Sequence, residues 1–168
     1  MSADMSADYI PFDRAFAREF SLQLQVGNAS APDGVTRVRM DGLGNLAAAQ
    51  YRRAAEATGR EQEAAGRQQK EGEDRKEPAS DEVKGEVPAE EAARMFDQVS
   101  LAPWDTRFPQ RPGIPDEAIV EVRLQRAGRE SATMKMWLRD AEKDVANGPV
   151  LEQLRRRVGE LSGGRIYL

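Results

Sequence analysis

The sequence predicts an α+β fold in which an antiparallel four-stranded sheet, built from two β-hairpins, carries helices packed on one face. Two stretches in which apolar and polar residues alternate, at 20–40 and 118–138, predict the hairpins. Two amphipathic stretches, at 88–99 and 149–161, predict the helices. A charged stretch between the first hairpin and the first helix predicts a disordered or weakly helical linker within this fold.

The first hairpin rests on the clearest alternation in the chain, Phe-Ser-Leu-Gln-Leu-Gln-Val at 20–26. Residues 27–34 contain Gly, Asn, Pro and Asp, which favour a turn, and residues 35–40 read as the returning strand. Successive side chains of a strand point to opposite faces. The inner face is therefore expected to carry Phe20, Leu22, Leu24, Val26, Thr36, Val38 and Met40.

The segment after this hairpin is open to two interpretations. Asn45 could cap a helix that begins at Leu46, because the following residues are strong helix formers. A third short strand that starts near Leu46 is the alternative, so residues 46–58 are either helix or strand.

A charged region follows, in which residues 56–86 are mainly Glu, Lys, Arg, Gln and Gly, with Val83 almost alone as a large apolar residue. Burial cannot offset the entropy cost of ordering such a segment. We therefore expect four parts. They are a disordered tail at 1–15, the first hairpin and its following short element at 16–55, a charged linker at 56–86, and residues 87–168, which pack with 16–55 as one domain.

The second half is expected to begin with a helix at Pro88, where Glu90 and Glu91 suit the positively polarised first turn. Prolines then recur between residues 102 and 117, which predicts a stiff extended crossing. The apolar stripe of this helix would be Ala92, Met95, Phe96 and Val99.

The second hairpin and the last helix complete the prediction. The strands would bury Ala118, Val120, Val122 and Leu124 on the way out and Ala132, Met134, Met136 and Leu138 on the return. The helix is expected to open at Gly148 and Pro149 and to close at Gly163. Its inner stripe would be Val150, Leu151, Leu154, Val158 and Leu161.

Composition narrows the possible functions. The chain has no Cys and no His, which excludes disulfides, thiolate nucleophiles, imidazole catalysis and zinc sites that need sulfur or nitrogen ligands. The net charge is -4, and the basic residues are interspersed with acidic ones, so we do not expect nucleic acid as a partner. No apolar run is long enough to span a membrane and no signal-peptide pattern opens the chain, so a cytoplasmic location is expected.

Two motifs resemble ligand-binding loops but lack their context. Gly42-Leu43-Gly44-Asn45-Leu46-Ala47 has the form of a dinucleotide-binding turn, but no apolar strand follows the next element, so we expect a glycine-rich turn and no cofactor. Asp140, Glu142 and Asp144 alternate like a calcium loop. The glycine and the final acid that such a loop needs are Val145 and Leu151, so no metal site is expected.

The candidate binding residues lie around the second hairpin. Trp137 alternates with buried positions, which places its ring on the polar sheet face beside Lys135, with Arg139 following; exposed Trp is enriched at interaction hot spots. Alternatively, a helix or the proline-rich crossing covers this ring. Trp104 and Phe108 either pin the crossing to the core or form a loop epitope.

Three stretches carry a family resemblance: Val-Pro-Ala-Glu-Glu-Ala-Ala-Arg-Met-Phe at 87–96, Arg-Pro-Gly-Ile-Pro-Asp-Glu at 111–117, and Pro-Val-Leu-Glu-Gln-Leu-Arg-Arg-Arg at 149–157. In this order, with the hairpin between the last two, they resemble the emfourin-type protein inhibitors of thermolysin-like metalloproteases. The resemblance covers about residues 87–162. It implies a small α+β domain that binds a metalloprotease.

We therefore expect a non-catalytic protein-binding module, an emfourin-like protease inhibitor or an accessory protein, rather than an enzyme. An enzyme would need carboxylates such as Asp116 or Asp140 to converge in a pocket. The alternative is a structural subunit that assembles with sister subunits through the tail 166–168 or a sheet edge.

Overall fold

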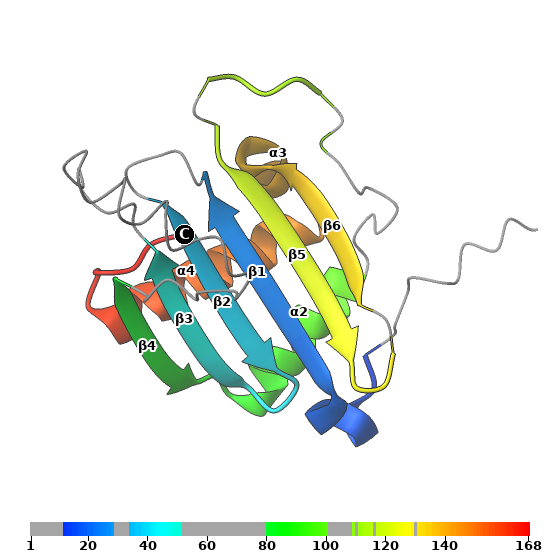
Figure 1. Cartoon of the computed structure of the whole chain (residues 1–168). Helices are drawn as coiled ribbons and strands as arrows, with labels where there is room; N and C mark the ends of the chain where they lie inside the picture. Colours follow the sequence, from blue (N-terminus) through cyan, green and yellow to red (C-terminus); the bar gives the residue numbers. More distant parts are fainter. Residues whose placement is uncertain are drawn as a thin grey trace, which may run out of the picture.

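The computed structural model describes residues 12–28, 34–51, 80–100, 109, 111–115, 117–129 and 131–168. They form one antiparallel sheet in the order β4-β3-β2-β1-β5-β6, with helices behind it (Figure 1). The strands are β1 (Phe20–Gly27), β2 (Val35–Asp41), β3 (Asn45–Tyr51), β4 (Asp81–Glu86), β5 (Ile119–Arg126) and β6 (Ala132–Trp137). The helices are the 3-10 helix η1 (Arg14–Glu19), α2 (Ala89–Ser100), α3 (Leu138–Lys143) and α4 (Asn147–Ser162).

The predicted α+β class with an antiparallel sheet is confirmed, but the sheet has six strands and not four. Strand β1 is central, because it pairs with β2 on one side and with β5 on the other. Leu22 accordingly lies opposite both Met40 and Leu124. The alternation predicted for both hairpins is confirmed by the burial of Phe20, Leu22, Leu24, Val26, Thr36, Val38, Met40, Val120, Val122, Leu124, Ala132, Met134 and Met136. Ala118 was also expected to be buried, but it precedes β5 and is only partly buried.

Helices α2 and α4 cover the apolar face of the sheet (Figure 1). All four residues of the stripe predicted for α2 are buried, and α4 buries Val150, Leu151, Leu154 and Val158. An ion pair between Arg157 of α4 and Glu91 of α2 joins the two helices. The hydrogen bond from Arg157 holds the pKa of Glu91 below its ordinary value.

An aromatic cluster lies at one end of the core and includes Phe12, which the sequence analysis assigned to a disordered tail. The ring of Phe12 stacks on Phe96, with centroids 4.7 Å apart, and meets the edge of Phe20 at 5.1 Å. Residues 12–15 are thus part of the folded structure, because the partly buried ring of Phe12 packs in this cluster. The rest of the predicted tail, residues 1–11, lies outside the described residues.

Two further strands replace the helix or linker considered for the middle of the chain. Residues 45–51 form β3, so the strand alternative for 46–58 holds for the described part. Residues 81–86, expected in the charged linker, form β4 at the sheet edge. An edge strand needs few apolar residues, because β3 supplies its hydrogen-bond partners and its outer side chains meet water. Residues 52–79 of the predicted linker lie outside the described part of the chain.

Two details of the second half also differ from expectation. The return strand ends at Trp137, and Leu138 begins the short helix α3 instead of extending the alternation. Leu161 is 39% exposed rather than buried, because it lies over Gly85 at the edge of the sheet. Gly163 adopts the left-handed conformation that closes α4, as predicted.

The C-terminal residues dock on the same core. The side chain of Ile166 is buried, and the Thr36 hydroxyl donates to the carbonyl oxygen of Tyr167 at 2.8 Å. Arg155 of α4 donates through Nε to the carbonyl oxygen of Leu168 at 3.0 Å. The apolar tail proposed for assembly therefore packs against its own chain.

The glycine-rich segment 42–44 is the turn between β2 and β3, as predicted. Gly44 has φ +97°, and a Cβ there would lie 2.1 Å from the carbonyl oxygen of Val87.

Gly44→Ala should therefore destabilise the protein by about 2 kcal/mol or more, measured by urea unfolding. Gly159→Ala is the control. This glycine lies in α4 with open space around its Cβ position, so the substitution should stabilise by about 0.5–1 kcal/mol. Equal midpoints for both variants would contradict the tight turn.

Candidate functional site

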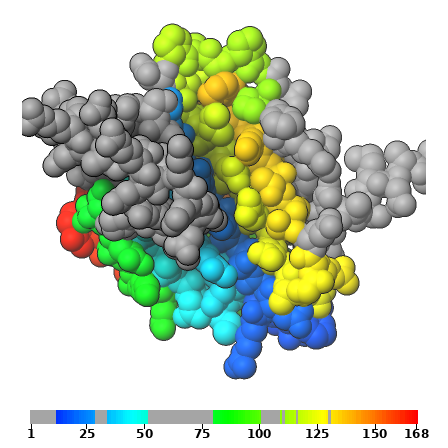
Figure 2. Space-filling view, in the orientation of Figure 1, coloured from blue at the N-terminus to red at the C-terminus, as the bar shows by residue number. Residues whose placement is uncertain are grey.

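The face of the sheet that points away from α2 and α4 is polar and solvent-facing. Figure 1 shows the strands in front of the helices, and Figure 2 shows, in the same orientation, the part of this face that is drawn in colour. We call it the open face; it is the set of strand positions that alternate with the buried ones. Its described residues include Ser21, Gln23, Gln25, Arg37, Arg39, Asp41, Asn45, Ala47, Ala49, Glu82, Lys84, Glu86, Glu121, Arg123, Gln125, Thr133, Lys135 and Trp137.

Strand register arranges the charges of the open face in rows. One row crosses all six strands and contains three cations and no carboxylate. Neighbouring strands lie about 4.8 Å apart, so the backbones that carry successive cations are about 10 Å apart. The row reads Lys84, Ala47, Arg39, Gln23, Arg123 and Thr133. We call it the cationic row.

Most charges beside the cationic row are satisfied by neighbours. Arg37 donates to the side-chain oxygen of Gln25 at 2.8 Å, and its guanidinium lies over the ring of Tyr51. Glu121 pairs with Arg123 at 3.4 Å and with Lys135 at 3.5 Å. Arg39 differs, because it is exposed and pairs with no carboxylate among the residues that the structure describes. The centre of the row therefore holds an unneutralised guanidinium.

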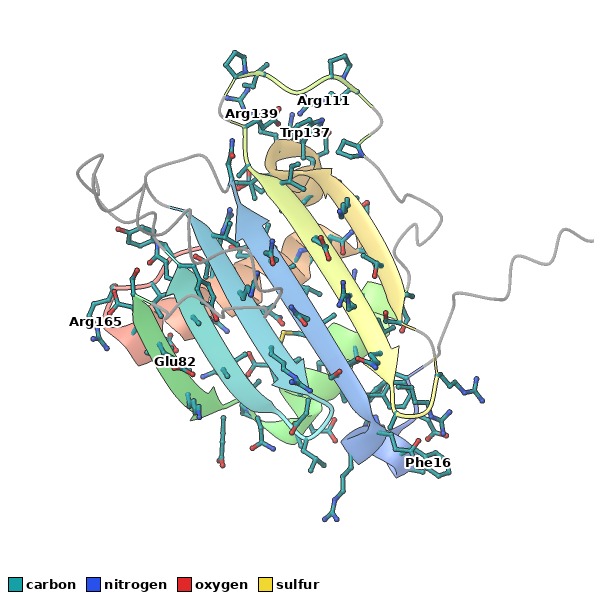
Figure 3. All side chains as sticks on the ribbon, in the orientation of Figure 1. Phe16, Glu82, Arg111, Trp137, Arg139 and Arg165 are labelled. Atoms are coloured by element: carbon teal, nitrogen blue, oxygen red, sulfur yellow. The ribbon has the colours of Figure 1, made fainter. Side chains whose placement is uncertain are left out.

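The indole of Trp137 is covered at one end of the open face. Its Nε1 donates to the carbonyl oxygen of Arg111 at 2.8 Å. Gly113 lies against the ring, since a Cβ at that position would be 2.5 Å from two ring carbons. Figure 3 shows Trp137 and Arg111 together at this end. Of the two alternatives for this ring, the structure has the one in which the crossing covers it.

A buried carboxylate holds the crossing in place. The side chain of Glu117 is 3% exposed and receives two hydrogen bonds from Arg111, at 2.6 and 3.1 Å, and one from the Ile114 amide at 3.1 Å. Arg111 also pairs with Asp140 at 3.0 Å, which ties the crossing to α3. The hydrogen bonds from Arg111 hold the pKa of Glu117 below its ordinary value.

The predicted binding residues thus separate into groups. Lys135 lies on the open face in an ion pair with Glu121, and Arg139 is exposed on α3 near the crossing (Figure 3). Trp137 hydrogen-bonds to the backbone of Arg111 in the crossing. Trp104 and Phe108 lie outside the described residues. The sequence analysis does not name Arg39 and Arg123 as candidates, although both alternate with the residues predicted to be buried.

The described residues contain no group of three or more acidic side chains that could hold a metal ion. A shallow depression on the open face is lined by Arg39, Asp41, Asn45, Ala47, Lys84 and Glu86. Asp41 is engaged in the β2–β3 turn, where its Oδ1 accepts from the Leu43 and Asn45 amides at 2.9 and 3.0 Å. None of the described helices is long and apolar enough to cross a membrane.

Comparison of the chain with protein-family models and with curated proteins finds no match.

The contact of Trp137 with Arg111 should weaken in acid, because Glu117 holds Arg111 in place. A pKa of Glu117 that is lowered in the folded protein means that its ionised form stabilises the crossing above the ordinary value near 4.5. That stabilisation is lost as the pH falls below this value. In a Trp104→Phe background, which leaves Trp137 as the single tryptophan, the fluorescence of Trp137 should shift to the red in this acid range.

Glu117→Gln should show the shifted emission already at neutral pH and lose the acid step, because the amide cannot hold Arg111 as an ion pair. Glu121→Gln on the open face serves as the matched control and should retain the step. An unchanged acid transition in Glu117→Gln would show that another group holds the crossing.

Proposed function

We propose that this chain is a non-catalytic protein-binding module, an emfourin-like protease inhibitor or an accessory protein, that binds its partner through the open face. The observation that carries the proposal is the asymmetry of the sheet. One face is covered by α2 and α4, whereas the other presents the cationic row, in which Lys84, Arg39 and Arg123 are exposed. A polar face of this kind can be desolvated against a complementary surface without unfolding the core.

The open face has the dimensions of a protein interface. Six strands spaced by about 4.8 Å give a width of about 25 Å, which suits the ~800 Å² that each partner contributes to a standard interface. The residues at its centre, Gln23, Arg39 and Arg123, combine two guanidinium groups with an amide. Arg is enriched in interfaces, since its planar fork pairs with carboxylates in two-point geometry.

The charges indicate the chemistry of the partner surface. Arg39 has no carboxylate partner among the described residues, and Arg123 shares Glu121 with Lys135. A partner that places carboxylates over the cationic row would complete these pairs and accelerate association by electrostatic steering. Because of the family resemblance at 87–162, a thermolysin-like metalloprotease is the first partner to test.

Assembly with sister subunits is the second candidate function. The tail 166–168 is engaged within the chain, with Ile166 buried and Tyr167 accepting a hydrogen bond from Thr36. Assembly would therefore use a sheet edge rather than this tail.

The proposal predicts that charge reversal on the open face abolishes partner capture. The double variant Arg39→Glu/Arg123→Glu should weaken binding by at least about tenfold, because it replaces attraction with repulsion at the centre of the interface. Arg94→Glu/Lys143→Glu, with the same change in charge on the helical side, should bind like the wild type. The partner is first captured from the native lysate, and the affinity of each variant is then measured by interferometry.

With a metalloprotease as the partner, residual protease activity gives a second readout. Equal affinity of the open-face variant and the wild type would contradict the proposal. Equal loss in both double variants would show that net charge, and not the open face, determines binding.

A further inference from the structure

Strand β4 is the end strand of the sheet that the described residues form. Among the described residues it pairs with β3 and with no other strand. Figure 1 shows it as the outermost strand, and Figure 3 labels Glu82 on it. The unpaired N–H and C=O groups of such an edge can hydrogen-bond to an extended chain.

The charged side chains of β4 alternate in sign, and the residues opposite them in β3 are uncharged. Glu82, Lys84 and Glu86 all lie on the open face, opposite Ala49, Ala47 and Asn45 respectively. Glu82 and Lys84 lie opposite alanines, whose side chains carry no charge, so neither has an oppositely charged cross-strand partner within the described sheet. Cross-strand pairs of opposite charge stabilise a sheet. Glu82 and Lys84 could form such pairs with a strand added on the other side of β4.

The opposite face of β4 is weakly apolar. Val83 is half-buried against the core, and Gly85 leaves room for Leu161 of α4, which remains 39% exposed. A strand added beyond β4 would cover the remaining exposed surface of Val83 and would lie beside Leu161.

We propose that β4 pairs antiparallel with β4 of a second copy of this chain, about a two-fold axis at Val83. In this register Glu82 lies opposite Lys84 of the second copy, and the symmetry repeats the pair. Val83 faces its own equivalent on the apolar side, and Asp81 lies opposite Gly85. The sequence of β4 is therefore self-complementary in charge.

The other symmetric registers are less favourable. An axis at Glu82 or at Lys84 places that residue opposite its own equivalent, so like charges meet. An axis at Gly85 pairs Lys84 with Glu86 but overlaps only residues 84–86 of the strand. At the far edge, β6 carries Lys135 as its single charge, so pairing β6 with itself brings no opposite charges together.

The proposed dimer also orients the open faces. A two-fold axis perpendicular to the sheet joins the two six-stranded sheets into one continuous sheet of twelve, with all helices on the same side. The two open faces then form a single surface. This inference rests on the second candidate function, assembly through a sheet edge, and is independent of binding to a foreign partner.

Charge reversal and its rescue test the dimer on the full chain by sedimentation velocity over about a hundredfold range of concentration. The wild type should change from monomer to dimer as concentration rises. Lys84→Glu and Glu82→Lys should each weaken dimerisation by at least about tenfold, because both symmetric pairs become repulsive. The swapped variant Glu82→Lys/Lys84→Glu should restore it, since the same pairs form with exchanged signs.

Glu86→Lys is the matched control, because Glu86 lies opposite Ser80 of the second copy in this register and should leave dimerisation unchanged. Circular dichroism checks that every variant is folded. The proposal is overturned by a wild type that remains monomeric throughout, by single reversals without effect, or by a swapped variant that fails to dimerise.

Discussion

The architecture depends on the pairing of β1 with two strands that are far apart in sequence. It pairs with β2 through residues 21–27 and with β5 through residues 20–27, so it joins the N-terminal hairpin to the C-terminal one. Its strict alternation also determines which face of both hairpins is buried, because side chains opposite one another point to the same face. Leu22, Leu24 and Val26 thereby align the apolar residues of β2 and β5 in one core.

The two faces of the sheet differ because both main helices lie on the same side. Helix α2 follows β4 and lies behind the sheet, and β5 lies on the other side of β1 (Figure 1). The C-terminal residues return with α4 to pack against β2 through Ile166 and Thr36. The described helices leave the open face uncovered, and on it Arg39 pairs with no described carboxylate. The proposed role in protein binding follows from that exposure.

The parts of the fold that could be predicted are those in which one segment carries its own periodicity. The alternation from Phe20 to Val26 and the α2 stripe ending at Val99 needed no knowledge of the rest of the chain. Strand β4 could not be predicted, because it contains Val83 as its only large apolar side chain and is held by the edge of β3. The same limit applies to the site. Alternation placed Trp137 on the polar face, but its contact with Arg111 joins segments 26 residues apart and could not be predicted from the hairpin alone.

Covalent footprinting of the chain alone and in complex with its captured protein partner tests the central claim, that the open face is the binding surface. We expect labelling of Gln23, Arg39 and Arg123 to fall in the complex, while labelling of Arg94 and Glu152 on the helical side stays the same. Protection confined to α2 and α4, with the open face labelled as strongly as in the free protein, would contradict the account.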